Sequence, residues 1–161
     1  MTCTIRDDGS NRVSPQQNPM ADEPWIWSFR KTIPSRSGAG QPVVEAILDQ
    51  LKQHAWIEHD MFGVHLALEE ALVNAIKHGN GLDEQKQVTV DCKMSSERLW
   101  IRITDEGSGF VPDDVPDPTT PENLDHTGGR GIMLMRSFMS RVEYNAEGNC
   151  VVMEKQRQST S

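Results

Sequence analysis

The chain has 161 residues, which is enough for one domain with its own hydrophobic core. Its formal net charge is -8 and its lysines and arginines are scattered, which argues against direct binding of nucleic acid. It has no run of about 18 apolar residues and no apolar stretch where a signal peptide would lie, so we expect a cytoplasmic protein without a membrane segment.

The cysteines carry little functional information. Cys3, Cys92 and Cys150 are far apart and show no CxxC spacing. Their arrangement argues against a disulfide framework and against a zinc site, so we expect free thiols.

Composition divides the chain into three parts. Residues 1–23 are rich in Ser, Asn, Gln, Pro and Asp and show no periodicity, which predicts a disordered tail. Residues 24–156 are expected to form the ordered domain, and residues 157–161 a short polar tail.

Two elements are expected at the start of the domain. Trp25, Trp27 and Phe29 alternate with other residues and predict a strand that continues to about residue 33. After a turn rich in Ser and Gly, apolar residues at helical spacing predict a helix over residues 43–54.

The stretch from Asp60 to Asn80 predicts the helix around which the domain is organised. Asp60 is the expected N-cap, and Gly79 the expected C-terminal stop. Six apolar residues recur at helical spacing and form one buried stripe: Val64, Leu68, Ala71, Leu72, Ala75 and Ile76.

A polar ridge borders that apolar stripe. Glu70, Asn74 and His78 follow one another at i, i+4 and i+8, and Lys77 lies close to Glu70. Polar groups at the edge of a core need partners, because burying them unpaired costs several kcal/mol. A bound metal ion and a phosphate would be such partners, whereas the alternative is an ordinary solvated helix face.

A hairpin and a glycine-rich turn follow the organising helix. Alternating apolar residues predict strands over residues 87–95 and 99–104, joined by a short turn. The second strand leads into Asp105, followed by Gly107 and Gly109, which permit a sharp turn and a close approach of the backbone.

The remainder of the domain is expected to form a loop, a helix and a hairpin. Residues 111–127 contain four prolines and little apolar content, which makes this loop a candidate lid. A glycine-rich segment, Gly128 to Gly131, then opens a helix beginning near Ile132. Residues 142–146 and 150–155 predict the closing hairpin.

These segments together suggest a nucleotide site. The free amides of Gly131, Ile132 and Met133 at a helix N-terminus, beside Arg130, would bind a polyphosphate. On the organising helix, Asn74 offers an oxygen to a hard cation such as Mg²⁺, Lys77 can meet a phosphate, and Glu70 can accept a proton.

The base of the nucleotide has a candidate partner as well. The Asp105 carboxylate, beside flexible glycines, can accept hydrogen bonds from an adenine amino group. Neither common nucleotide motif is present, because the chain lacks both the P-loop pattern and a complete dinucleotide fingerprint.

Three motifs in this order resemble the GHKL (Bergerat-fold) ATPases. Residues 69–79, 105–110 and 128–135 resemble their N, G1 and G2 boxes, over a similarity that extends from about Trp25 to Lys155. Within this group, the compact domain resembles the anti-sigma-factor serine/threonine kinases. The resemblance implies an α+β two-layer sandwich, with a mixed sheet, helices on one face, and ATP between helices and lid.

The resemblance also implies a role for each motif residue. It makes Glu70 the general base that activates a serine hydroxyl, and Asn74 the ligand of Mg²⁺. It places Asp105 at the adenine amino group. Lys77 and Arg130 would face phosphates, His78 would either touch ATP or fill a structural role at the helix end, and the backbone would close around ATP at Gly107, Gly109, Gly129 and Gly131.

The expected partners follow from the same resemblance. Members of this group bind a sigma factor, hold it inactive, and phosphorylate an antagonist protein; they are often homodimers. One alternative is a binding module in which ATP sets the conformation that grips a partner, without phosphotransfer. A second is the catalytic domain of a histidine kinase, which is disfavoured because too few residues precede the organising helix to add a helical hairpin.

Overall fold

The computed structural model describes residues 24–107 and 127–158, with the backbone alone for residues 127–130. The predicted tail at residues 1–23, the predicted lid apart from its last residue, and Gly109 lie outside the described residues. No helix in the described ranges combines the length and the apolarity needed to cross a membrane.

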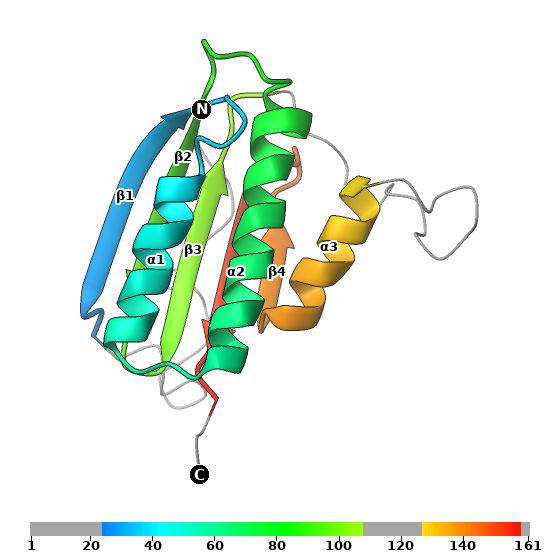
Figure 1. The fold of residues 1–161 in the computed structure, drawn as a ribbon. Coiled ribbons are helices and arrows are strands. Elements are labelled where there is room, and N and C mark those ends of the chain that lie inside the picture. The colour runs from blue at the N-terminus through cyan, green and yellow to red at the C-terminus, as the bar shows by residue number, and fades with distance from the viewer. Residues whose placement is uncertain (1–23, 108–126, 159–161) are drawn as a thin grey trace.

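The described elements follow the predicted order (Figure 1). The domain begins with a strand and two helices, continues with a hairpin, and ends with a helix and a second hairpin. The elements are β1 (Trp27–Pro34), α1 (Gln41–Gln53), α2 (Glu58–Val73), η3 (Asn74–Gly79), β2 (Gln87–Met94), β3 (Arg98–Thr104), α3 (Thr127–Phe138), β4 (Arg141–Tyr144) and β5 (Cys150–Gln156).

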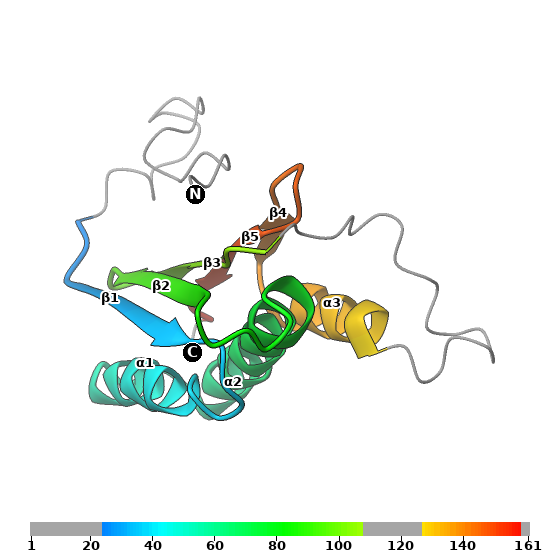
Figure 2. The ribbon, with the colours of Figure 1, turned by 90° about the horizontal axis from the view of Figure 1, so that it is seen from above.

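The five strands form one sheet in the order β1-β2-β3-β5-β4. The three α-helices cover one of its faces, as Figure 2 shows from above, so the α+β two-layer fold is confirmed. The mixed sheet implied by the resemblance is wrong for the described strands, because every neighbouring pair is antiparallel. Two hairpins, β2–β3 and β4–β5, make up most of the sheet, and hairpins pair their strands antiparallel.

The core lies between the sheet and the helices. Alternate residues of β2, Val88 to Met94, are fully buried, as the period-two pattern predicts. Apolar residues of α1 and α2 meet this face of the sheet, including Ile47, Val64 and Leu68. The helix that carries the polar ridge is therefore held firmly against the sheet.

The organising helix differs from its prediction at both ends. It begins at Glu58 with Ile57 as N-cap, so the prediction of Asp60 as N-cap is wrong. Asp60 is instead buried in the first turn, where its Oδ2 accepts a hydrogen bond of 2.8 Å from the backbone N–H of Gln158. The helical course ends at Gly79 as predicted, but its last six residues form the π-helical segment η3.

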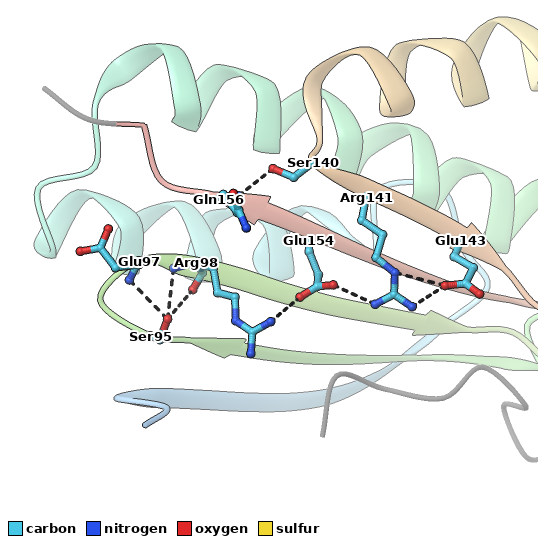
Figure 3. A network of polar contacts seen from close by, with 8 residues as sticks. All are labelled: Ser95, Glu97, Arg98, Ser140, Arg141, Glu143, Glu154 and Gln156. Carbon is cyan, nitrogen blue, oxygen red and sulfur yellow. Dashed lines mark hydrogen bonds and ion pairs between the residues drawn. The ribbon is translucent and has the colours of Figure 1, made fainter. Parts of the chain in front are cut away.

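At the opposite end of β3 from Asp105, polar side chains bind the strands to one another (Figure 3). Arg98 donates to Glu154 at 2.8 Å, and Arg141 donates to the other carboxylate oxygen at 2.8 Å. Ser95 accepts hydrogen bonds from the amides of Glu97 and Arg98 in the turn between β2 and β3. This network fixes the sheet far from the candidate site.

The prediction of free thiols is only partly correct. Cys92 is a buried free thiol, and burial raises its pKa. Cys150 is disulfide-bonded, so the prediction is wrong there. Cys3 lies outside the described residues.

Candidate nucleotide site

The π-helical segment η3 gives the site its shape. It follows α2 without a break, and the Asn80 amide donates to the Ala75 carbonyl at 2.9 Å, five residues back. Such segments are rare and frequently occur at functional sites. In η3, Asn74 and Ile76 are buried while Lys77 and His78 are exposed, so the predicted ridge is divided between the interior and the surface.

Glu70 lies where α2 meets α3. Its carboxylate lies against the backbone of Gly131, and a Cβ added at Gly131 would overlap Glu70 Oε2. Burial raises the pKa of Glu70, the neighbouring charge of Glu69 raises it further, and His78 lowers it. The first and third motifs of the sequence are therefore in direct contact.

Asn74 is oriented by a residue from the other end of the chain. Its Nδ2 donates to the Tyr144 hydroxyl at 3.4 Å, where β4 ends. Burial raises the pKa of Tyr144 to about 12, so its hydroxyl stays neutral near pH 7. This contact uses the nitrogen of the Asn74 carboxamide, which leaves its oxygen as the end suited to a cation.

Asp105 follows β3 and lies beneath the end of η3. Its Oδ1 accepts a hydrogen bond of 2.8 Å from the Gly107 amide, and its carboxylate lies against the Gly79 backbone, which has no space for a side chain. Burial raises the pKa of Asp105 to about 6, while the Gly107 hydrogen bond and the charge of Lys86 lower it. The carboxylate is therefore ionised at neutral pH and can accept hydrogen bonds.

A small cavity joins these residues. Asn74, Asp105 and Tyr144 line it with polar atoms, and Ile103 and Val151 line it with apolar ones. The cavity measures only about 10 Å³, which is space for about one water molecule, so its walls would have to separate before a flat heteroaromatic ring could enter. The cavity places the second motif of the sequence beside the first.

A larger pocket lies elsewhere, between α1 and α2. Val44, Leu72 and Ile76 line it, together with Glu69 and Lys77. It lacks Asn74 and Asp105, so we assign the candidate site by chemistry to the smaller cavity. Lys77 lines this larger pocket, whereas Asn74 and Asp105 are the predicted site residues that line the small cavity.

The phosphate-binding segment differs in register from its prediction. The helix α3 begins at Thr127, so Gly129, Arg130 and Gly131 lie in its first turns. The unpartnered amides of a helix belong to its first turn, which in α3 starts at Thr127 and therefore precedes Gly131. The prediction that the amides of Gly131, Ile132 and Met133 begin the helix is wrong, and the Ile132 side chain is buried in the core.

The residues present fit a magnesium nucleotide better than a metal held by protein alone. The described part of the chain contains no group of three or more His, Cys, Asp or Glu residues arranged for a metal ion. Mg²⁺ in nucleotide sites commonly takes one or two protein ligands, with phosphates and waters completing its shell. The Asn74 oxygen is a suitable single ligand of that kind.

Two residues of the site were missed by sequence reasoning. Tyr144 holds Asn74, and Asn80 is bonded to the turn that follows Asp105. Tyr144 is the only tyrosine in the chain and ends a short strand, which is a weak signal. Asn80 directly follows Gly79, so the sequence could place it at the end of the helix, but it could not predict its hydrogen-bond partners.

The chain is similar in sequence to known proteins. The model of the histidine kinase-like ATPase domain matches residues 42–155. The serine-protein kinase RsbW of Listeria monocytogenes is 29% identical over 97 residues, which are 56% of this chain and 62% of that protein. The anti-sigma F factor of Clostridium perfringens is 28% identical over 102 residues, covering 60% of this chain and 72% of that protein.

A solved structure supports the fold. The crystal structure of the RsbU and RsbW domains of Rv1364c from Mycobacterium tuberculosis matches with a TM-score of 0.58 and 14% identity, over 83% of this chain and 34% of that chain. The match to the Listeria kinase covers less than two thirds of that protein. Because the family model spans most of the described domain and the motifs converge on one site, the chain belongs to the histidine kinase-like ATPase domain family.

Proposed function

We propose that this protein is an ATP-dependent serine/threonine-protein kinase that acts as an anti-sigma factor and phosphorylates an antagonist protein. The observation that carries the proposal is the convergence of three distant segments. Glu70 lies against Gly131, and Asp105 lies against Gly79. The relatives are named serine-protein kinase and anti-sigma F factor, which supports the same role at the level of the family.

In this proposal, adenine binds beside Asp105, where the small cavity has to widen to receive it. The ionised carboxylate accepts a hydrogen bond from the adenine amino group, while Ile103 and Val151 provide apolar walls for the ring. The phosphates then extend toward the first turn of α3, whose free amides and positive dipole end favour negative charge. Gly129 and Arg130 belong to that turn.

Mg²⁺ would be held by the Asn74 oxygen together with phosphate oxygens. When bound, the ion neutralises the negative charge that develops on the phosphates. The Tyr144 hydroxyl holds the nitrogen end of the same carboxamide and so keeps its oxygen available. Lys77 and His78 are exposed, and in this proposal their side chains contact the phosphates.

Glu70 is the proposed general base. It takes the proton of a serine or threonine hydroxyl while the hydroxyl oxygen bonds to the γ-phosphorus and the bond to ADP breaks. Burial raises its pKa, which makes the carboxylate a stronger base than one in water. Its position against Gly131 places it beside the turn that is proposed to receive the phosphates.

The proposed partners are a sigma factor and an antagonist protein that is released after phosphorylation. A homodimer in the cytoplasm is the assembly that we expect from the resemblance. The matched region covers only part of the named relatives. The proposal of these partners therefore rests on membership of the family and on the shared motifs.

The test is phosphate transfer from γ-labelled ATP into proteins of the cells from which the chain derives. Wild-type protein should label serine or threonine on one small protein, and Glu70→Gln should reduce that labelling at least a hundredfold. Glu70→Gln should bind ATP as wild type does, because it keeps the shape of the side chain. Glu69→Gln is the matched control, since Glu69 is exposed and paired with His65 at 2.9 Å.

The outcomes separate the kinase from the alternatives. Labelling that survives in Glu70→Gln would remove the base role of Glu70. Binding of ATP without any transfer by wild type would favour an ATP-regulated protein-binding module. Labelling on histidine, which is acid-labile, would favour the histidine kinase alternative.

A further inference from the structure

Asn80 is a buried residue to which the proposed mechanism gives no role. It follows Gly79 directly, and its side chain is only 3% exposed. A carboxamide is costly to bury unless its donors and its acceptor find partners. In Asn80 all of these groups are used.

The three hydrogen bonds of Asn80 reach three different segments. Its Nδ2 donates to Ser35 Oγ at 2.7 Å, just after β1, and to the Gln87 carbonyl at 3.1 Å, where β2 begins. Its Oδ1 accepts from the Glu106 amide at 2.8 Å, in the turn after β3. One side chain therefore connects the end of η3 to the turn that carries Asp105.

That turn is held tightly against η3. Gly107 packs so closely on the Gly79 carbonyl that it has no space for a Cβ, and its amide binds Asp105 Oδ1. The Asn80 bond to Glu106 lies between these two contacts in the sequence. The Gln87 amide also donates to the Glu106 side chain, and the Asp105 amide donates to the Asn149 carbonyl. Asn80 is therefore one of the groups that fix the turn beside the Asp105 carboxylate.

We propose that Asn80 is a positioning residue for nucleotide-base selectivity, acting through the Glu106 amide on the place of the Asp105 carboxylate. The inference rests on the proposed function, in which Asp105 accepts a hydrogen bond from the adenine amino group. Guanine carries a carbonyl oxygen at the matching position, which a carboxylate repels. A correctly placed Asp105 therefore favours ATP over GTP.

The test compares the affinities of variants for ATP and GTP by calorimetry. Wild type should bind ATP more tightly than GTP. Asn80→Ala leaves the Glu106 amide without its acceptor, so the turn shifts, and the ratio of the two affinities should fall about tenfold. A purely structural role for Asn80 would weaken both nucleotides alike and leave their ratio unchanged.

Two control variants isolate the bond to Glu106. Ser35→Ala removes another partner of Asn80 from the same network, but it leaves the Glu106 contact in place. Ser95→Ala removes a buried hydroxyl at the far end of β3, in the network of Figure 3. Both should lower the melting temperature while keeping the wild-type ratio of ATP to GTP affinity.

Each outcome has a definite meaning. If Asn80→Ala does not fold, Asn80→Ser is measured instead, because its hydroxyl keeps a polar group at the position, and the same loss of selectivity is expected. If wild type prefers ATP and a folded Asn80 variant keeps the same ratio of ATP to GTP affinity, the role of Asn80 is overturned while the proposed adenine contact stands. Wild type that binds neither nucleotide, or both equally, overturns the proposed adenine contact and this inference with it.

Discussion

Asp105 is subject to two opposing demands. As a partner for adenine it must be ionised, yet its burial favours the neutral form and raises its pKa from 3.8 to about 6. The folded chain therefore binds a proton at Asp105 more tightly than the unfolded chain does. Ionised Asp105 destabilises the fold above pH 6, and this penalty fades as the pH falls from about 6 to about 4.

The first prediction concerns this penalty. Asp105→Asn keeps an oxygen for the Gly107 amide and removes the charge, so it should raise the free energy of unfolding at pH 7. At pH 4 the two proteins should be nearly equal in stability, because Asp105 is then protonated in the folded chain, and little of the penalty remains at a pH close to its unfolded pKa of 3.8. Urea denaturation at the two pH values measures both differences, and lower stability of Asp105→Asn at pH 7 would contradict the account.

The second prediction concerns binding. Affinity for ATP should fall as the pH is lowered through about 6, because the proton then occupies the Asp105 oxygen that would accept from the adenine amino group, while Oδ1 stays bonded to the Gly107 amide. Asp105→Asn should bind ATP weakly and without that step. Titration calorimetry between pH 5 and pH 8 follows both proteins, and a step of equal size in the variant would assign the pH dependence to another group.

At the scale of the elements, two contacts of the site are made by glycines. Gly131 of α3 lies against α2, and Gly107, in the turn after β3, lies against η3. The atoms that each glycine meets are different. A Cβ at Gly131 would meet the end of the Glu70 side chain, which can rotate away. A Cβ at Gly107 would meet the backbone of Gly79, which cannot move without disturbing η3. Replacement by alanine should therefore reduce function at Gly131 and reduce stability at Gly107.

The third prediction follows from that difference. Gly131→Ala should keep stability within about 1 kcal/mol of wild type, since alanine favours a helix, but it should reduce phosphate transfer at least tenfold by displacing Glu70. Gly107→Ala should lower the free energy of unfolding by about 2 kcal/mol or more. Thermal melts and the transfer assay together check the pair, and the reverse order of effects would argue against the described contacts.

At the scale of the whole molecule, the sequence predicted the order of the elements and the family of the motifs well. The alternation in β2 and the stripe on α2 each depend on a local period, so the pattern alone was sufficient. The boundaries were less accurate. Asp60 looked like an N-cap, but the helix starts earlier because the carboxylate is used by the C-terminal segment at Gln158.

What could not be predicted depends on contacts between distant segments. The π-helical form of η3 has no local sequence signal, and the partners of Asn80 lie 45, 7 and 26 residues away. The pairing of Asn74 with Tyr144 spans 70 residues in the same way. Helical-wheel geometry placed Lys77 close to Glu70, whereas in the structure it lines the pocket between α1 and α2.

The central claim is that these segments form a magnesium-nucleotide site, and a thermal melt with and without ATP and Mg²⁺ tests it most directly. A ligand at about 100 times its dissociation constant adds about 2.7 kcal/mol, which should raise the melting temperature of wild type by about 5–10 °C. Asn74→Ala should fold and show a much smaller rise, because it lacks the proposed ligand of Mg²⁺. No rise for wild type at millimolar ATP and Mg²⁺ would contradict the account.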